Sequence, residues 1–219
     1  MPVSAYLRAT VLLIAAAAAL FGSAGTLAVL SFWLYWAMLV AVFIAAFALL
    51  DRGLLQERMR PGGRPTPLGL RLLNVVLLTH WVIAGLDRCR LHWSDNVPLW
   101  LQLLGLFIII ASYALVFWAM VVNRFFSSVV RIQSDRGHVV VTGGPYAFVR
   151  HPGYSAGILI LAASGVALGS WLAAAFLIAI TVPFLLYRVI NEDRVLQARL
   201  DGYTDYACRV RWRLLPGIW

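Results

Sequence analysis

Charged residues are scarce in this chain, and lysine is missing altogether. Only 12% of the 219 residues are charged, whereas 62% are hydrophobic. Soluble domains average about 25% charged and about 45 to 50% apolar residues. This composition excludes an ordinary soluble domain and indicates a protein that is embedded in a membrane.

Cysteine is equally scarce, since the chain contains only Cys89 and Cys208. The two residues lie in separate polar segments, which the topology described below places on opposite sides of the membrane. Neither has the spacing of a metal ligand set. We therefore expect two free thiols, no intrachain disulfide and no bound metal.

The positive charge of the chain comes from arginine alone. All 18 basic residues are arginines, and the formal net charge is +9. Such a charge could indicate nucleic-acid binding, but these arginines flank apolar runs. Arginine in that position is typical of cytoplasmic loops and of contact with anionic lipid headgroups. We expect contacts with membrane lipids and no nucleic-acid partner.

Six apolar runs have the composition of membrane helices, which need about 20 residues to cross a hydrocarbon core of about 30 Å. They cover residues 6–23, 26–50, 68–86, 98–122, 153–168 and 171–190. The first run also resembles a signal peptide. Because the second run follows almost at once, a helical hairpin is the better interpretation. The sequence predicts an all-α, polytopic membrane bundle of about six transmembrane helices.

Polar segments divide these runs into two regions. Residues 51–67 contain several prolines and glycines and are predicted to form a loop, and so are residues 87–97. We predict an N-terminal region, 1–122, with about four transmembrane helices, and a C-terminal region, 123–219, with two. The polar tail at the end is too short to span. It is predicted either to cap a cavity as a helical lid or to lie on the membrane as an amphipathic helix.

The distribution of arginine predicts the orientation. The loops after the second and fourth runs carry four arginines each. The tail also carries several arginines, whereas Arg88 and Arg90 alone lie on the opposite side. Because positive charge favours the cytoplasmic side, we expect a protein of the inner, cytoplasmic membrane with both termini and the long loops in the cytoplasm. A soluble cofactor would enter from that face.

One polar segment stands at the mouth of a predicted membrane helix. It reads Gly143-Gly144-Pro145-Tyr146-Ala147-Phe148-Val149-Arg150-His151-Pro152-Gly153-Tyr154. An arginine, a histidine and two tyrosines are costly to desolvate there unless they face a polar cavity. They could instead reach lipid headgroups or form an interfacial aromatic belt. Taken as a group, they favour a binding site.

A second polar group follows the last apolar run. Arg188 and Glu192 are four residues apart and share a helical face, and Asp193 adjoins them. The arginine and the glutamate could simply form a supporting ion pair. Alternatively, Glu192 binds a ligand's ammonium or ribose hydroxyls while Arg188 or Arg150 holds its carboxylate.

Together these segments resemble a known family. The string Gly144 to Tyr154, the acids Glu192 and Asp193, and a tail with Gly202, Tyr203, Tyr206, Arg213 and Pro216 are similar to the isoprenylcysteine carboxyl methyltransferases and the related phospholipid N-methyltransferases. The resemblance covers about residues 123–219. It implies a helical membrane enzyme that binds S-adenosylmethionine between its last spans and its tail. A lipophilic acceptor would enter from the bilayer.

The resemblance also implies roles for individual residues. Contacts with the cofactor are implied for Gly144, Pro145, Tyr146, His151, Pro152, Tyr154, Glu192, Tyr203 and Tyr206, and catalytic roles for Arg150 and Glu192. The family usually has two adjacent glutamates, whereas the second acid here is Asp193, and no role is assigned to it. The Gly-x-Gly-x-x-Gly fingerprint of soluble nucleotide-binding folds is missing from this chain, as it is from the family.

We predict a methyltransferase that acts on the carboxyl group of an isoprenylcysteine-like or other lipophilic acid. N-methylation of a phospholipid headgroup is the alternative. A carboxylate is already ionised near neutral pH, and Arg150 would position it. An amine would need a base, for which His151 or Glu192 is the candidate.

Two other classes of protein remain open. Membrane lipid and sterol reductases that use NADPH carry a similar Arg-His-Pro-x-Tyr string, and the basic loop from Arg124 to Arg136 could bind the extra phosphates of that cofactor. A scaffold or transporter is the other class. Against transport, His80 is the main ionisable residue within a run, and it could be a buried histidine bonded to a neighbouring helix. The sequence does not predict the oligomeric state.

Overall fold

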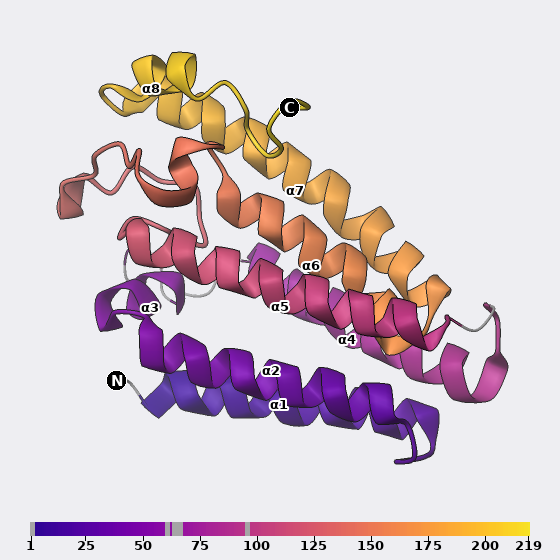
Figure 1. Cartoon of the computed structure of the whole chain (residues 1–219). Helices are drawn as coiled ribbons and strands as arrows, with labels where there is room; N and C mark the ends of the chain where they lie inside the picture. Colours follow the sequence, from indigo (N-terminus) through magenta and orange to yellow (C-terminus); the bar gives the residue numbers. More distant parts are fainter. Residues whose placement is uncertain (1–2, 60–61, 63–67, 95–96) are drawn as a thin grey trace.

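The computed structural model of the chain describes residues 3–59, 62, 68–94 and 97–219, and every regular element in these residues is helical. The elements are α1 (Val3–Ala24), α2 (Leu30–Leu49), α3 (Arg52–Met59), α4 (Leu68–Leu86), η2 (Asp87–Leu91), α5 (Leu99–Val122), η3 (Ser134–Arg136), η4 (Gly144–Ala147), α6 (Pro152–Leu168), α7 (Trp171–Arg199) and α8 (Tyr203–Arg209). The predicted all-α class is confirmed, and the long helices form one bundle (Figure 1).

The long helices have the dimensions of membrane spans. Within the described residues, five segments are long and apolar enough to cross a membrane, namely Tyr6–Ala24, Leu30–Leu49, Arg71–Leu91, Leu99–Val122 and Trp171–Arg199. With 17 residues, α6 is shorter, and it rises about 25 Å, close to the thickness of a hydrocarbon core. The protein is therefore an integral membrane bundle of about six spanning helices, as predicted.

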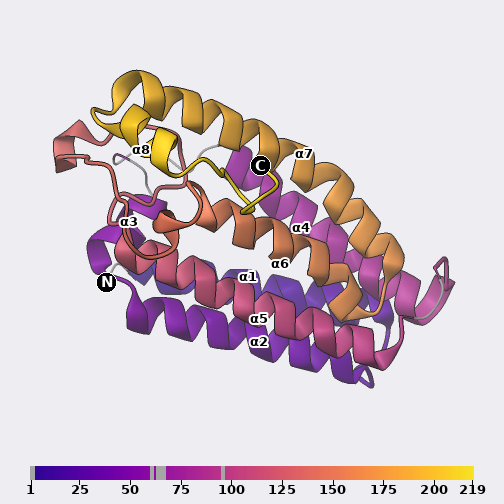
Figure 2. The same ribbon diagram turned by 45° about the horizontal axis from the view of Figure 1, so that its top comes forward.

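The longest helix, α7, carries polar residues out of the apolar layer. Its 29 residues rise about 44 Å, which exceeds a hydrocarbon core of about 30 Å. In both ribbon views, the end of α7, α8, the segment between α5 and α6, and α3 lie at the same end of the bundle (Figures 1 and 2). The polar segments of the chain thus gather at one end of the bundle, where α8 is the predicted helical cap.

One predicted loop is partly helical. Residues 51–67 were expected to form a loop, but α3 occupies Arg52–Met59. The carboxylate of Asp51 accepts hydrogen bonds from the backbone N–H of Gly53 at 2.7 Å and of Leu54 at 3.3 Å, as an N-cap residue does. Leu54 is buried against Leu50 and Met120. The expectation was wrong for this stretch, while Arg60 and Arg64 of the same loop lie outside the described residues.

The second predicted loop also begins as a helix. After α4, residues Asp87–Leu91 form a π-helical turn that ends at His92 in a left-handed conformation. Asp87 is buried, and its carboxylate accepts hydrogen bonds from the backbone N–H of Ser94 at 2.8 Å and from the hydroxyl of Ser170. These bonds tie the α4–α5 connection to the α6–α7 turn. Cys89 and Cys208 are both free thiols, as expected.

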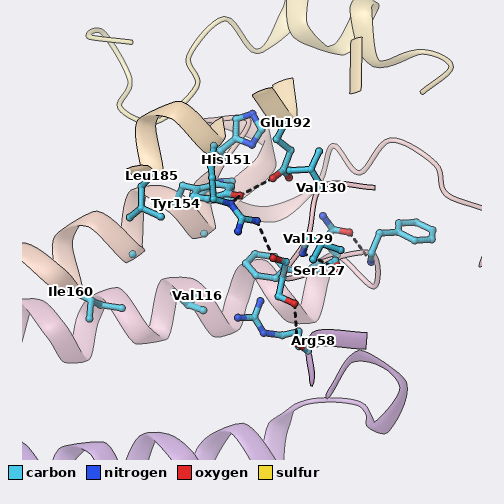
Figure 3. A pocket seen from close by; sticks show the side chains of 18 of the residues that line it. Arg58, Val116, Ser127, Val129, Val130, His151, Tyr154, Ile160, Leu185 and Glu192 are labelled. Carbon is cyan, nitrogen blue, oxygen red and sulfur yellow. Dashed lines mark hydrogen bonds between the residues drawn. The ribbon is translucent and has the colours of Figure 1, made fainter. Parts of the chain in front are cut away.

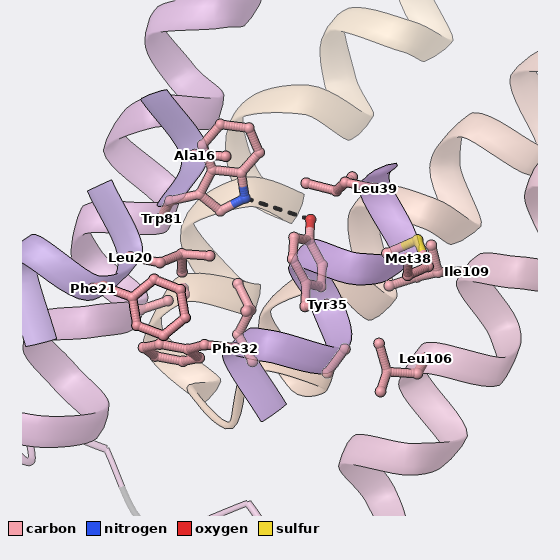
Figure 4. Packing of buried hydrophobic residues seen from close by; sticks show 14 of the residues in the cluster. Ala16, Leu20, Phe21, Phe32, Tyr35, Met38, Leu39, Trp81, Leu106 and Ile109 are labelled. Atoms are coloured by element: carbon pink, nitrogen blue, oxygen red, sulfur yellow. Dashed lines mark hydrogen bonds between the residues drawn. The ribbon is translucent and has the colours of Figure 1, made fainter. Parts of the chain in front are cut away.

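An apolar core joins the N-terminal helices to α5. Phe21, Phe32, Trp81 and Leu106 are among its buried members (Figure 4). The rings of Phe21 and Phe32 meet edge to face at 5.9 Å, so α1 and α2 pack as the predicted helical hairpin. Each such aromatic pair adds about 0.5 to 1.5 kcal/mol beyond the burial of its surface.

Inside this core, a chain of hydrogen bonds runs from the Tyr35 hydroxyl through Ser164 and His80 to the carbonyl oxygen of Ala173. Nδ1 of His80 lies 3.1 Å from the carbonyl oxygen of Ala173 and therefore carries a hydrogen. Nε2 of His80 then accepts from Ser164 Oγ at 2.9 Å, and Ser164 accepts from the Tyr35 hydroxyl at 2.8 Å. His80 is completely buried. The interpretation of His80 as a buried histidine bonded to neighbouring helices is confirmed.

Candidate functional site

A cavity of about 460 Å³ opens at the polar end of the bundle and continues between the membrane helices. Its volume lies within the range of about 300 to 1,000 Å³ that is typical of small-molecule sites. His151, Tyr154 and Glu192 lie on one side of it, and Arg58 enters from the other (Figure 3). Its deeper wall is mostly apolar and includes Leu12, Leu39, Leu77, Tyr113, Val116, Ile160 and Phe184.

Most of the residues that the resemblance singled out share this cavity. Its lining includes Tyr146, Arg150, His151, Pro152, Tyr154, Glu192, Tyr203 and Tyr206. They come from η4, the start of α6, the end of α7 and α8, so segments that are far apart in the sequence meet here. Their roles in binding and catalysis stay predictions.

Gly144 and Pro145 are not part of the cavity wall. Pro145 is buried. Gly144 has a φ of +57°, and a Cβ there would lie 2.9 Å from Val122 Cγ2 and 3.1 Å from Trp118 Nε1. A glycine is needed for this turn and for its close packing on α5. The cofactor contacts predicted for both residues stay predictions.

Asp193 is the centre of the polar end. Its carboxylate is 1% exposed. Its oxygens accept hydrogen bonds from Arg150 Nε at 2.9 Å and Nη2 at 3.0 Å, Gln197 Nε2 at 2.9 Å, Tyr203 Oη at 3.0 Å and Arg213 Nε at 3.0 Å, and His151 Nε2 lies 3.3 Å away. The sequence assigned no role to this acid, which joins α7 to α6, α8 and the tail.

The guanidinium of Arg150 points toward Asp193 and the tail. The hypothesis that Arg150 holds Glu192 is wrong, because its guanidinium pairs with Asp193. Its Nη1 donates to the carbonyl oxygens of Val210 at 2.9 Å and Arg211 at 3.1 Å. A guanidinium has five N–H donors, and most of them are used here by protein acceptors. The catalytic role predicted for Arg150 stays a prediction, and the geometry favours a positioning role.

The tail is bound along the entrance to α6. The backbone N–H of Arg150 donates to the Trp212 carbonyl at 2.9 Å, and that of His151 donates to the Arg213 carbonyl at 2.9 Å. Ser155 Oγ donates to the Leu214 carbonyl at 2.7 Å. These bonds fix the tail against the start of α6, so it is not a freely lying surface helix, while its predicted role as a lid stays a prediction.

Two tyrosines of α8 close the same end. The Tyr206 hydroxyl donates to the carbonyl oxygen of Tyr146 at 2.7 Å. Burial, together with the nearby Asp193 charge, raises the pKa of Tyr203, and burial raises the pKa of Tyr206 to about 12. Both phenols therefore remain protonated at neutral pH and act as hydrogen-bond donors.

Glu192 faces the cavity and keeps one oxygen open. The Tyr154 hydroxyl donates to its Oε2 at 2.8 Å, and Arg188 Nε donates to the Tyr154 oxygen at 3.1 Å. The simple ion pair between Arg188 and Glu192 is therefore replaced by a tyrosine bridge. Within the described residues Oε1 of Glu192 accepts no hydrogen bond, so it is available to a ligand.

A contact that sequence reasoning missed fastens α3 to the long polar segment. Glu57 accepts from Arg131 Nε and Nη2, each at 3.0 Å, and from Ser127 Oγ at 3.0 Å. Burial alone would raise the pKa of Glu57, but the hydrogen bonds from Arg131, Gly62 and Ser127 bring it below its ordinary value. Glu57 is thus a carboxylate at neutral pH and clamps α3 against the cavity.

Comparison with known proteins identifies the C-terminal part of this arrangement. Residues 103–198 match the family described as the isoprenylcysteine carboxyl methyltransferase (ICMT) family. The match includes the string at the start of α6 and the acids at the end of α7. This part of the chain is therefore similar to the ICMT family. The predicted resemblance is confirmed, while α1 to α4 lie outside the matched residues.

A solved structure has a fold similar to that of this chain. It is that of the eukaryotic intramembrane Ras methyltransferase ICMT, with a TM-score of 0.62 and 17% sequence identity. The similarity covers 94% of this chain and 72% of the other. The common fold therefore includes the N-terminal helices, which the sequence match does not reach. A search of the curated proteins found no match.

Proposed function

We propose that this chain is an integral membrane methyltransferase that uses S-adenosylmethionine and acts on the carboxyl group of an isoprenylcysteine-like or other lipophilic acid. One observation carries the proposal. Residues of the family's motifs converge on a cavity that is polar at the end of the bundle and apolar between the membrane helices. A site of this kind suits a soluble cofactor and a lipophilic acceptor that must meet.

The polar end fits the proposed cofactor. The open Oε1 of Glu192 suits an ammonium group or ribose hydroxyls, because charged acceptors form the stronger hydrogen bonds. Tyr146 and Tyr154 add aromatic surfaces that favour a cation, and His151 lies beside them. When bound, S-adenosylmethionine supplies an electrophilic methyl group on a positively charged sulfur.

The rest of the cavity would align the acceptor and exclude water. A carboxylate is ionised near neutral pH, so its attack needs alignment more than it needs a base. Alignment alone can supply a large part of the reduction in the barrier. Val116, Ile160 and Phe184 offer apolar contacts for a lipid chain. The tail, held by Asp193 and Arg150, would keep water from the polar end.

N-methylation of an amine is less well supported by the side chains present. It needs a group that removes a proton. His151 Nε2 faces Asp193, and Glu192 already accepts a hydrogen bond from Tyr154. Glu192 is assigned to the cofactor in this proposal, so an amine would depend on His151 alone, whereas a carboxylate acceptor needs neither base.

The reductase alternative loses the basic loop that was expected to bind the extra phosphates of NADPH. Arg131 is paired with Glu57 and Asp135, and Arg136 donates to Gln133 Oε1 at 2.6 Å. Arg124 Nη2 lies 3.5 Å from the carbonyl oxygens of Arg136 and Gly137. The guanidinium groups of this loop are therefore engaged with protein acceptors instead of forming an open phosphate site.

Cofactor binding tests the proposal. In equilibrium dialysis we expect the purified protein to bind labelled S-adenosylmethionine saturably, with displacement by S-adenosylhomocysteine, and not to bind labelled NADPH. In sealed vesicles, S-adenosylmethionine should bind only to protein whose polar end faces outward. On the basis of the arginine distribution, we propose that this end faces the cytoplasm in the cell. Saturable NADPH binding that S-adenosylmethionine does not displace would favour a reductase instead.

A further inference from the structure

Arg58 reaches the cavity from a part of the chain that the family match does not include. It lies on α3, outside residues 103–198, yet it lines the cavity together with Tyr154 and Glu192. In Figure 3 it enters from the side opposite these two residues. The N-terminal region therefore contributes a cation to a site whose other polar groups come mainly from the C-terminal region.

The charge of Arg58 is not neutralised by the described residues. Its neighbour Glu57 is engaged by Arg131, and Asp193 is engaged by Arg150 and Arg213. Arg58 itself forms no ion pair in the described ranges. Its guanidinium lies 5.0 Å from the centre of the Phe126 ring. A cation that is half-buried against an aromatic ring has lost part of its hydration, and an anionic ligand would restore favourable contacts.

The charged side chains that line the cavity are also positive in sum. Once the internally paired groups are set aside, Arg58 and Arg188 contribute two positive charges and Glu192 contributes one negative charge. Glu192 lies on the side of Tyr154 and His151, where the proposed cofactor contacts are. The positive excess is thus available to the second substrate, and it disfavours one with a cationic group.

Arg58 is also held in place before any ligand arrives. The carbonyl oxygen of Arg58 accepts from Ser128 Oγ at 2.9 Å. The adjacent Glu57 is clamped by two bonds from Arg131 and one from Ser127. These bonds fix the backbone at Arg58, and a segment that is already ordered loses less freedom on binding. The guanidinium is thus presented from a fixed helix, against the Phe126 ring.

We propose that Arg58 is a specificity-determining residue that binds the anionic group of the acceptor. The inference rests on the proposed function and deepens it, because it assigns recognition of the acceptor's charge to α3. The same chemistry could serve a carboxylate on the acceptor or a phosphate of a membrane lipid. A pair of acceptor analogues and two lipid environments separate these sources.

The experiment compares binding of N-acetyl-S-farnesylcysteine with binding of its carboxamide, which lacks the charge. Full-length protein is titrated as wild type, R58Q, R58K and R52Q, both in a neutral detergent and in vesicles that contain phosphatidylglycerol. Arg52 is exposed on the same helix and is the matched control. We expect R58Q to weaken binding of the carboxylate about 10- to 100-fold, as loss of a charged hydrogen bond does. R58K should recover part of this loss because it keeps the charge.

Binding of the carboxamide and of S-adenosylmethionine should be the same in R58Q as in wild type, and R52Q should match wild type throughout. Equal affinity of R58Q and wild type for the carboxylate would overturn the inference. So would an equal loss for both analogues, or a loss that arises only in vesicles that contain phosphatidylglycerol. Failure of the proposed function would look different, because the wild type itself would then bind no S-adenosylmethionine.

Discussion

E192Q should weaken binding of S-adenosylmethionine about 10- to 100-fold. The substitution keeps the shape of the side chain and an acceptor for the Tyr154 hydroxyl, which lies 2.8 Å from Oε2. It removes the negative charge that we propose for recognition of the cofactor's cationic or hydroxyl groups, and hydrogen bonds to charged groups are worth about 1.5 to 3 kcal/mol. Equilibrium dialysis with labelled cofactor measures the change.

The exposed acid Asp201 provides the control for this substitution. D201N removes the same charge a short distance along the chain and should bind the cofactor as wild type does. The thermal unfolding midpoint of E192Q should also match that of wild type, because Glu192 forms no ion pair among the described residues. Cofactor affinity that is unchanged in E192Q would remove Glu192 from the proposed site.

D193N should destabilise the folded protein by about 3 to 5 kcal/mol and abolish cofactor binding. Loss of one partner from a buried ion pair leaves an uncompensated buried charge. Here the guanidinium of Arg150 would be left facing a neutral amide, and the contact with Arg213 that holds the tail would weaken. Thermal unfolding in detergent and cofactor binding, measured on the same preparation, give the two results.

D205N is the matched control, since Asp205 is exposed on α8 close to the same hub. We expect its free energy of unfolding to stay within about 0.5 kcal/mol of the wild-type value, as it generally does for surface substitutions. If D193N and D205N proved equally stable and D193N bound the cofactor normally, Asp193 would not organise the polar end.

The spanning helices could be predicted from the sequence because their signal is local. A run of about 20 apolar residues has few alternatives to a membrane helix. The ends of α1, α2, α4, α5 and α7 were therefore predicted within a few residues, except that α7 continues past the predicted end at Ile190 to Arg199. The short helix α3 was missed because its composition is polar and prolines follow it. The signal that could have revealed it is the Asp51 cap followed by the apolar Leu54 and Leu55.

The candidate site was predictable where polar residues stand in an apolar setting. Tyr146, His151, Tyr154 and Glu192 were identified in that way, and the structure brings all four to one cavity. The cost of desolvating such groups is a property of their position along the chain, so it can be read without knowing their partners.

The partners themselves could not be predicted. Asp193 and Arg150 are 43 positions apart, and Glu57 and Arg131 are 74 positions apart. Such pairings depend on how helices pack, which the local pattern does not contain. The resemblance also gives no role to Asp193, because the family usually has a glutamate at this position. A shorter acid fits a hub that is 1% exposed and surrounded by donors.

The N-terminal region could be given no role, because the local pattern of an apolar helix does not show what the helix contacts. The cavity crosses the predicted boundary at residue 122 and is lined by Leu12, Leu39, Leu77 and Tyr113 as well as by residues of α6 and α7. Their hydrophobic character is equally compatible with lipid contact, with core packing or with a binding wall. The division into regions 1–122 and 123–219 stays a prediction, and the proposed site includes parts of both.

Methyl transfer by the purified wild-type protein tests the central claim most directly. Methyl-labelled S-adenosylmethionine is incubated with the protein in detergent and N-acetyl-S-farnesylcysteine as acceptor. We expect label in a methyl ester that alkali releases as methanol, with one S-adenosylhomocysteine formed for each ester. Label that is stable to alkali on an amine of added phosphatidylethanolamine, or no transfer to the acid by folded protein, would contradict carboxyl methylation.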